Sequence, residues 1–309
     1  MQSILKTQLH RILFMPLVNG VNELKAVSRA YALWRIKQTD VPYRDIWSSL
    51  MTSKDPQTGS GFTEEVLISE ACLFIVAGTD TTITGLSETL FYLMKNPRVL
   101  ERLTREIREY FPLQASDHGR RGRDVECPIK WGSSELQKIT YLQACMDEAM
   151  RLSPPLAGVL PREVGEGGMV VDGEFFPAGV NLAINTYSMH HDERNFEQAL
   201  SYVPERFLPV DEKADAVPSI KDPAAFAPFG VGRTSCIGKH LAYQEMSVIL
   251  ARLLWLFDLR QEPGNNKGGG KGDAVEGRGC KTEYQLKDHY VSAQDGPVIQ
   301  FRYRDEVKA

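Results

Sequence analysis

The first part of the chain follows the hydrophobic periodicity of α-helices. Between residues 22 and 37, apolar side chains recur at helical spacing, at Leu24, Val27, Tyr31 and Trp34. Residues 43–51 predict a second, short helix. The stretch KDPQTGSG at 54–61 has the turn-forming residues of a loop, so a break is expected before the next element.

The longest helical pattern starts at Thr63 and continues to Asn96, where Pro97 is well placed to open the next helix. Thr63 is a candidate N-cap, and the acidic Glu64 and Glu65 follow in the first turn, where the helix dipole favours negative charge. A helix of about 30 residues is roughly 45 Å long. We therefore expect it to cross the whole domain as its central helix.

The rest of the chain predicts more helices, a few short strands and two loops. The expected helices are 97–111, 134–152 and 239–257, the last with an apolar face of Leu241, Met246, Ile249, Leu250, Leu253 and Leu254. The expected strands, which alternate with glycine turns such as Asp172-Gly173, are 159–164, 169–171 and 180–184. Residues 114–132 are expected to be a polar loop, and 262–281 a flexible insertion too polar and glycine-rich to bury anything. We predict a mainly α chain with a small β-sheet region, forming one domain over 1–309.

Composition and charge fit an ordinary globular protein and exclude several functions. The 309 residues are 42% hydrophobic and 25% charged, which allows a sizeable core. The net charge of −4, with basic residues neither in excess nor clustered on one predicted face, argues against a nucleic acid partner. The five cysteines are widely spaced, so neither a disulfide framework nor a structural zinc site is expected, and a reducing compartment is favoured. No apolar run approaches the ~20 residues that a membrane span needs, so no span is expected in this chain.

The most informative stretch is the glycine-rich loop FAPFGVGRTSCIG at 226–238, which directly precedes the predicted helix 239–257. Glycines let backbone N–H groups approach the sulfur of Cys236, and the start of the helix adds positive potential. Both effects favour a thiolate that binds a soft metal, so Cys236 is our candidate iron ligand. The alternative is that Cys236 is a small buried hydrophobe, as free cysteines usually are.

The pattern F-x-x-G-x-x-x-C-x-G in this loop resembles the haem-binding loop of the cytochromes P-450, the haem-thiolate monooxygenases. The resemblance implies that Cys236 is the proximal ligand of haem b (iron protoporphyrin IX), whose thiolate donates electron density that favours O–O cleavage. The haem-contacting positions that it implies are Phe229, Gly230, Gly232 and Gly238. One position departs from the family, because Thr234 stands where Arg or His usually helps to hold a haem propionate, and Arg233 is the neighbouring candidate for that role.

A second motif, AGTDTT at 77–82, lies inside the predicted central helix. Glycine, threonine and aspartate are weak helix formers, so their concentration there is costly unless it serves a purpose. Thr81 is placed to bond the carbonyl of Ala77 and open a local groove. The motif matches the family's oxygen-binding groove, [AG]-G-x-[DE]-T-[TS], which implies that Ala77 and Gly78 border the haem. It also implies that Thr81 hydrogen-bonds dioxygen and that Asp80 feeds protons toward it. The alternative is a helix kink with solvated side chains.

A third motif pairs charges within one helix. Glu148 and Arg151 form an E-x-x-R sequence, which places them on one helix face, although such a pair alone is usually a surface ion pair of little value. Pro204-Glu205-Arg206-Phe207 follows later in the chain. The family resemblance implies that Glu148, Arg151 and Arg206 form a buried structural network behind the haem.

Other residues have weaker signals. The resemblance implies that residues 156–160 line the substrate pocket and that Arg162 holds a haem propionate, the alternative being a surface charge on a strand. His190 and His191 form no ligand pattern with cysteines, and we expect them to be polar residues at a helix end.

Some features of the family have no match here. A typical member has, before its central helix, a membrane anchor, a further sheet portion and a W-x-x-x-R helix whose side chains hold the propionates. Here Trp34 is followed four residues later by Gln38, and Trp47 by Met51. We therefore expect this chain to be the C-terminal part of the fold, incomplete at its N-terminus. A haem pocket left open to water is expected to bind haem weakly.

The resemblance implies a monooxygenase that inserts one atom of O2 into an unactivated C–H or C=C bond of an apolar small molecule. NADPH–cytochrome P-450 reductase is the implied electron donor, docking on the cysteine side at Arg233, Lys239 and His240. The stretch CIGKHLAYQEM is similar to fungal members of secondary-metabolite biosynthesis. The family also implies that a full-length form lies at the cytosolic face of the endoplasmic reticulum membrane.

Two other functions stay open at this stage. The first is a catalytically incompetent remnant that does not retain haem, for which the missing N-terminal region is the reason. The second is a haem-thiolate isomerase or dehydratase that needs no oxygen, against which the intact pair of Asp80 and Thr81 argues.

Overall fold

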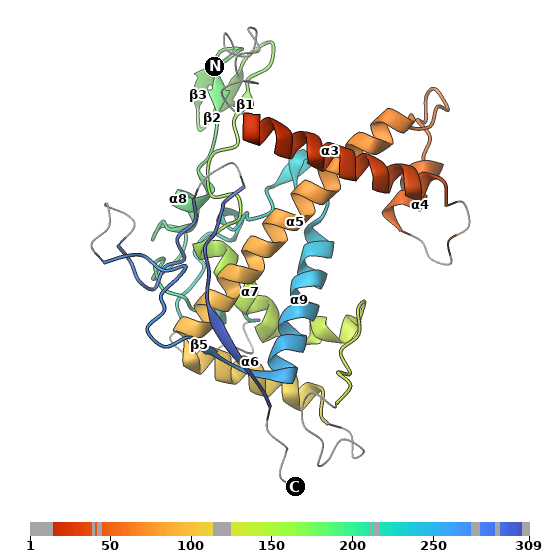
Figure 1. Ribbon diagram of the computed structural model, residues 1–309. Coiled ribbons are helices and arrows are strands. Elements are labelled where there is room, and N and C mark those ends of the chain that lie inside the picture. The colour runs from red at the N-terminus through yellow and green to blue at the C-terminus, as the bar shows by residue number, and fades with distance from the viewer. Residues whose placement is uncertain are drawn as a thin grey trace. The chain divides into compact units, whose positions relative to one another are not determined.

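The computed structural model describes residues 15–38, 41, 45–113, 125–209, 212, 217–272, 279–287 and 291–304 (Figure 1). The chain divides into two compact units, Met1–Asp80 and Thr81–Ala309. Part of the predicted polar loop, 114–124, and part of the predicted insertion, 273–278, lie outside the described residues.

The first unit contains α3 (Met15–Ile36), α4 (Ile46–Thr52) and the N-terminal part of α5 (Glu64–Lys95), as the sequence predicted. Arg35, near the end of α3, donates from Nε to Asp45 Oδ2 at 2.8 Å and from Nη2 to Ser48 Oγ at 3.0 Å. Asp45 is also the N-cap of α4, because its carboxylate accepts a hydrogen bond from Ser48 N. These bonds join the end of α3 to the start of α4.

The buried face of α3 differs from the face that its apolar residues suggest. Val27, Tyr31 and Trp34 are exposed, whereas Ser28 and Ala32 are buried. The hydrophobic spacing thus predicted the helix correctly but does not mark its packed side.

The central helix and its successor begin and end close to the predicted residues. Thr63 Oγ1 accepts a hydrogen bond from Val66 N at 3.4 Å, and α5 then continues to Lys95. Pro97 opens α6 (Pro97–Tyr110), where a missing backbone N–H costs nothing. Both helix starts are therefore explained by local chemistry.

The core of the second unit lies between α6, the 3-10 helix η3 (Ser134–Lys138), α7 (Thr140–Leu152) and α9 (Lys239–Leu256). Trp255 Nε1, at the end of α9, donates to Phe111 O after α6 at 2.6 Å. The predicted single helix 134–152 is divided at Ile139 into η3 and α7. The predicted face of α9 is wrong in part, since Leu241 and Ile249 are exposed while Val248 and Trp255 are buried.

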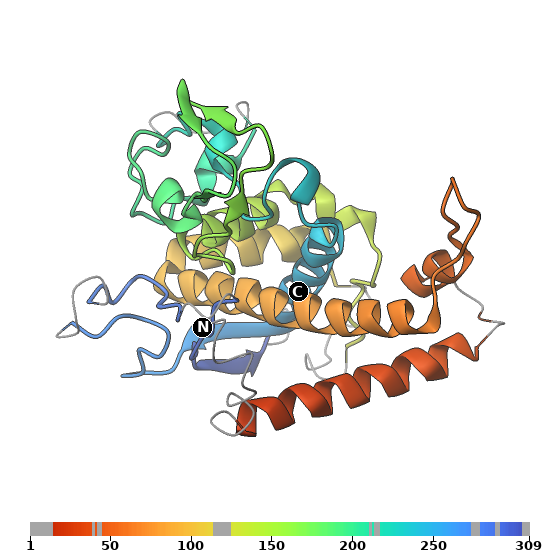
Figure 2. The same cartoon turned by 90° about the horizontal axis from the view of Figure 1, so that it is seen from above.

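Among its described residues, the second unit also has three two-stranded antiparallel sheets. They pair β1 (Arg162–Glu163) with β4 (Asn181–Leu182), β2 (Met169–Val171) with β3 (Glu174–Phe176), and β5 (Phe257–Gln261) with β6 (Ile299–Tyr303). β2 has the predicted bounds, whereas β1 and β4 are shorter than the predicted strands 159–164 and 180–184. The predicted turn at Asp172 and Gly173 joins β2 to β3, and both residues have positive φ. The β1–β3 region lies at the opposite end of this unit from β5 (Figure 1), and Figure 2 shows β5 and β6 side by side.

The stretch 262–272 packs into the second unit, so the expectation that 262–281 buries nothing is wrong there. Gly270 is buried, and Lys95 Nζ donates to Asn266 Oδ1 at 2.5 Å. A side-chain carbon at Gly268 would lie 2.6 Å from Tyr284. Glycine is abundant here partly because another part of the chain approaches the backbone closely.

The prediction of a mainly α chain with a small β-sheet region is confirmed. Among the described residues, α5 is the one helix long and apolar enough to cross a membrane, by length and composition. The prediction that no stretch suits a span needs correction on these grounds. The core helix of a globular protein meets the same criterion, because it too is long and apolar.

Candidate functional site

The loop 226–238 folds back so that Cys236 returns to Phe229. Cys236 N donates to the carbonyl oxygen of Phe229 at 2.8 Å. Gly230 and Gly232 have φ angles of +67° and +69°, in the left-handed region that glycine enters without strain. The two glycines therefore allow the reversal that places the cysteine.

Cys236 presents an exposed thiol beside the start of α9. Gly238 is the N-cap of α9, and a side-chain carbon at that position would lie 3.6 Å from Cys236 Sγ. The sulfur is thus close to the backbone of a helix start, where the helix dipole is positive. The alternative that Cys236 is a small buried hydrophobe is wrong for this structure.

Cys236 offers one sulfur ligand, which suits a metal whose other ligands belong to a flat organic group. Within the described part of the chain, no group of three or more His, Cys, Asp or Glu side chains could hold a metal ion. Val231 and Ile237, on either side of the cysteine in sequence, are 68% and 94% exposed. A single soft ligand between exposed apolar side chains suits the thiolate side of a haem.

Side chains of α7 and α9 support the loop. The ring centroid of Phe229 lies 5.1 Å from that of Tyr243, and Lys239 Nζ lies 5.8 Å from the Phe229 centroid. Tyr243 Oη donates to Asp147 Oδ1 at 2.5 Å. Burial raises the pKa of Asp147 to about 6, although the Tyr243 hydrogen bond opposes the shift. No sequence motif pointed to Asp147, because its only signal is a carboxylate beside Glu148.

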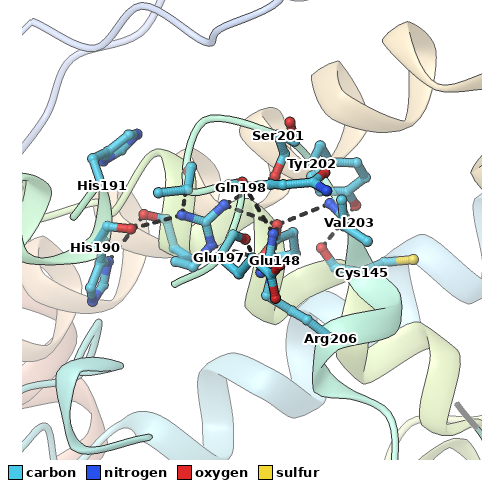
Figure 3. A network of polar contacts seen from close by, with 12 residues as sticks. Cys145, Glu148, His190, His191, Glu197, Gln198, Ser201, Tyr202, Val203 and Arg206 are labelled. Carbon is cyan, nitrogen blue, oxygen red and sulfur yellow. Dashed lines mark hydrogen bonds and ion pairs between the residues drawn. The ribbon is translucent and has the colours of Figure 1, made fainter. Parts of the chain in front are cut away.

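The structure brings Glu148, Arg151 and Arg206 together (Figure 3). Arg151 Nε lies 2.8 Å from Glu148 Oε2, and Arg206 Nε lies 3.0 Å from Glu148 Oε1. All three side chains are excluded from solvent. Burial lowers the pKa of Arg206 from its ordinary value, while the charge of Glu148 opposes that shift.

Backbone groups satisfy the rest of this network. Glu148 Oε1 also accepts from Val203 N at 2.9 Å. The remaining guanidinium donors mostly reach carbonyl oxygens of the chain between α8 (Thr186–His190) and the 3-10 helix η4 (Pro204–Phe207). Arg151 Nη1 donates to Ala199 O at 2.7 Å, and Arg206 Nη1 donates to Glu197 O at 2.7 Å. The network therefore fixes the loop between these two elements.

The expectation that His190 and His191 are simply polar residues at a helix end is incomplete. His190 ends α8 as expected, but it is fully buried, with hydrogen bonds at both ring nitrogens. His191 bonds through Nδ1 to Tyr187 O, at 2.8 Å, within its own turn. A histidine in a polar stretch carries no sequence signal for such burial.

The motif AGTDTT lies on α5, which is helical throughout 64–95. Ala77, Gly78 and Asp80 belong to the first unit and are exposed, and the half-buried Thr81 begins the second unit. A side-chain carbon at Gly78 would meet no atom within 4 Å. The roles of these residues toward oxygen stay predictions.

The same helix contains a feature that the sequence did not reveal. Glu88 is fully buried, and neither carboxyl oxygen has a hydrogen-bond partner among the described residues. Burial raises its pKa well above 4.5, because a buried carboxyl is more stable in its neutral form.

The basic residues of the predicted site are all exposed. Arg162, on β1, donates from Nη1 to Pro161 O at 3.1 Å and to Leu160 O at 3.3 Å. Arg233, Lys239 and His240 are exposed around the cysteine loop. Propionate binding by Arg162 or Arg233 stays a prediction.

Comparisons with known sequences agree on one family. The family model described as Cytochrome P450 matches residues 26–268. A cytochrome P450 monooxygenase of Gibberella zeae is 40% identical over 265 residues, covering 85% of this chain and 57% of the relative. The monooxygenase poxM of Penicillium oxalicum is 36% identical, covering 85% of this chain and 46% of the relative. This chain spans about half the length of these curated relatives.

A shorter relative and a solved structure give the same picture. The cytochrome P450 monooxygenase lcsN of Purpureocillium lilacinum is 35% identical, with 87% of this chain and 74% of the relative covered. The crystal structure of the cytochrome P450 CYP102L1 matches with a TM-score of 0.67 at 22% identity. The match covers 92% of this chain and 56% of that structure, and at this identity it establishes the fold.

Proposed function

The chain belongs to the cytochrome P450 family, and from this premise we propose that Cys236 binds the iron of haem b in a monooxygenase. One observation carries the proposal: an exposed sulfur on a loop whose cysteine N–H bonds back to Phe229 O at 2.8 Å. The activity is proposed for the whole protein, because the chain covers 57% and 46% of two of its relatives.

Members of this family use O2, a redox partner and a small-molecule substrate. When bound, the haem supplies the activation of dioxygen. We assign to Cys236 the binding of iron, and to the hydroxyl of Thr81 and the carboxylate of Asp80 the holding and moving of protons. Glu148, Arg151 and Arg206 take no part in the chemistry, and they hold the chain behind the cysteine loop.

For the finer function we propose oxygen insertion into an apolar small molecule of fungal secondary metabolism. The support is the fungal source of the relatives and the sequence CIGKHLAYQEM around the cysteine, which is similar to fungal members. NADPH–cytochrome P450 reductase is the proposed electron donor, with the exposed Arg233, Lys239 and His240 as its docking charges. The proposed location is the cytosolic face of the endoplasmic reticulum membrane, which rests on the family alone.

The test is haem uptake by residues 1–309, followed by the reduced carbon monoxide difference spectrum. We expect a thiolate-ligated band, because a cysteine sulfur is the proposed ligand. Cys236→Ser is expected to abolish that band. Cys280→Ser, at another exposed free cysteine, is the matched control and should leave it unchanged.

Two results would contradict the proposal. A thiolate band that persists in Cys236→Ser would remove the ligand assignment. Failure of the unaltered chain to take up any haem would support the alternative of a remnant that does not retain haem.

A further inference from the structure

His190 lies between the buried ion network and the cysteine loop. It is the last residue of α8 and is fully buried. Its carbonyl oxygen accepts a hydrogen bond from Arg151 Nη1 at 2.8 Å, and its side chain reaches the start of the loop at Ala227. Figure 3 shows His190 beside the network of Glu148 and Arg206.

The two ring nitrogens of His190 have partners of opposite kind. Nδ1 lies 3.0 Å from the carbonyl oxygen of Arg151, which only accepts, so Nδ1 carries the proton. Ala227 N–H only donates, and it donates to Nε2 at 3.1 Å. The imidazole is therefore neutral, with the proton on Nδ1. Burial, which lowers the pKa of His190 to about 4, favours the same neutral state.

Further hydrogen bonds connect His190 to the cysteine. Ala227 O accepts from Gly230 N at 3.0 Å, and Phe229 O accepts from Cys236 N at 2.8 Å. The ring of Phe226 stacks on the imidazole with centroids 5.7 Å apart. His190 thus supports both the backbone and the first side chain of the loop that ends at the sulfur.

We propose that His190 is a positioning residue for Cys236, which ties the C-terminal turn of α7 to the cysteine loop through its two ring nitrogens. The reason is that Ala227 N–H, at the start of the loop, donates to His190 Nε2, while the carbonyl oxygen of Arg151, at the end of α7, accepts from Nδ1. Among the described residues, Arg151 and His191 are the charged or titratable side chains that act on His190. This inference rests on the proposed function, because positioning Cys236 serves haem binding. The hydrogen bond from Ala227 N–H to His190 Nε2 does not depend on that function.

Three substitutions of His190 test its bonds to Arg151 O and Ala227 N separately, because their side chains differ in length and polarity. Glutamine places an acceptor near the position of Nε2, so His190→Gln keeps the bond from Ala227. Asparagine is shorter and places a donor near Nδ1, so His190→Asn keeps only the bond to Arg151. His190→Leu keeps neither bond. His191→Asn is the matched control, because His191 is bonded through Nδ1 to Tyr187 O in its own turn and not to the cysteine loop within the described residues.

The first measurement is hydrogen–deuterium exchange of peptides covering 226–238 in the haem-free chain. We expect exchange about tenfold faster in His190→Asn and His190→Leu, because an amide whose partner is lost opens more often. His190→Gln and His191→Asn should stay within about threefold of the unaltered chain. Unchanged exchange in His190→Asn overturns the proposal, as does equal acceleration in all three His190 variants, which indicates a general loss of packing.

The second measurement is the thiolate-ligated fraction in the carbon monoxide spectrum at equal haem loading. We expect this fraction to fall in His190→Asn and to be kept in His190→Gln. A purely structural role of His190 would change the fraction equally in both variants. An equal fraction in these two variants overturns the proposal. If the unaltered chain binds no haem, the proposed function fails while the exchange experiment still decides the role of His190.

Discussion

Arg206 and Glu148 lie 58 residues apart in sequence, and their side chains meet at 3.0 Å, fully excluded from solvent. The same carboxylate also binds Arg151, at 2.8 Å. One buried anion therefore offsets two buried cations, and the structure depends on that anion more than on either partner.

Glu148→Gln is expected to destabilise the protein strongly. It leaves two guanidinium groups buried without their counter-charge, and removal of one partner of a buried ion pair costs about 3–5 kcal/mol. Urea denaturation followed by circular dichroism measures the loss. Glu106→Gln is the control, since Glu106 pairs with Arg102 in a half-exposed i, i+4 contact and should cost less than about 1 kcal/mol. Equal losses in the two variants would show that the buried network is not a special support.

Glu88 is expected to make stability fall as pH rises. Its folded-state pKa lies well above 4.5, so the folded protein retains a proton that the unfolded chain loses. The stability from this group is complete below pH 4.5 and is lost as pH rises toward the folded pKa. Between pH 4.5 and the folded-state pKa, the stability of Glu88→Gln should therefore rise relative to that of the unaltered chain by up to about 1.4 kcal/mol per pH unit.

Urea midpoints at several pH values check the Glu88 prediction. Glu166→Gln, at an exposed turn, is the matched control and should run parallel to the unaltered chain. If the curve for Glu88→Gln runs parallel to that of the unaltered chain, the pKa of Glu88 is the same in the folded and unfolded states, and the prediction is wrong.

Thr81→Ala is expected to keep the haem but to uncouple oxygen consumption from product. The proposed function gives the Thr81 hydroxyl a role in proton delivery, and such roles contribute about 10²–10⁴-fold to rate. Product per oxygen consumed should fall by at least about tenfold, with hydrogen peroxide formed instead. Thr81→Ser should restore most of the coupling, and Thr79→Ala is the control at an exposed neighbour. Unchanged coupling in Thr81→Ala would remove this role, and product without oxygen consumption would favour an isomerase or dehydratase.

Reductase-supported turnover is expected to depend on salt. Exposed charges are screened over about 8–10 Å at moderate ionic strength, so turnover should drop by about an order of magnitude at raised salt. Lys239→Glu, beside the cysteine loop, should lower turnover at low salt. Arg260→Glu, at the exposed position of β5, should not change turnover. A rate independent of salt would count against docking on the cysteine side.

Local sequence signals predicted the elements well where short-range chemistry determines them. The start of α5 after Thr63 and the start of α6 at Pro97 follow from capping and from the missing proline donor. The turn at Asp172 and Gly173 likewise follows from residues that tolerate positive φ. The cysteine loop and the two arginines of the network were found through family motifs, whose spacing already contains long-range information.

The errors concern burial, which depends on partners distant in sequence. Trp34 and Ile249 are apolar and at helical spacing, but they are exposed because no described part of the chain covers them. His190 is polar and buried because Ala227 and Arg151 together supply its hydrogen bonds. Gly270 is buried in a stretch whose composition suggested solvent. Hydrophobic pattern alone does not contain these contacts.

Gly230 and Gly232 have a consequence for directed evolution. Both have positive φ, so almost any other side chain there would strain the backbone that returns Cys236 to Phe229. A randomised library at these two codons should yield glycine among functional clones far more often than chance. Diversity for new substrate scope is therefore better introduced elsewhere in the chain.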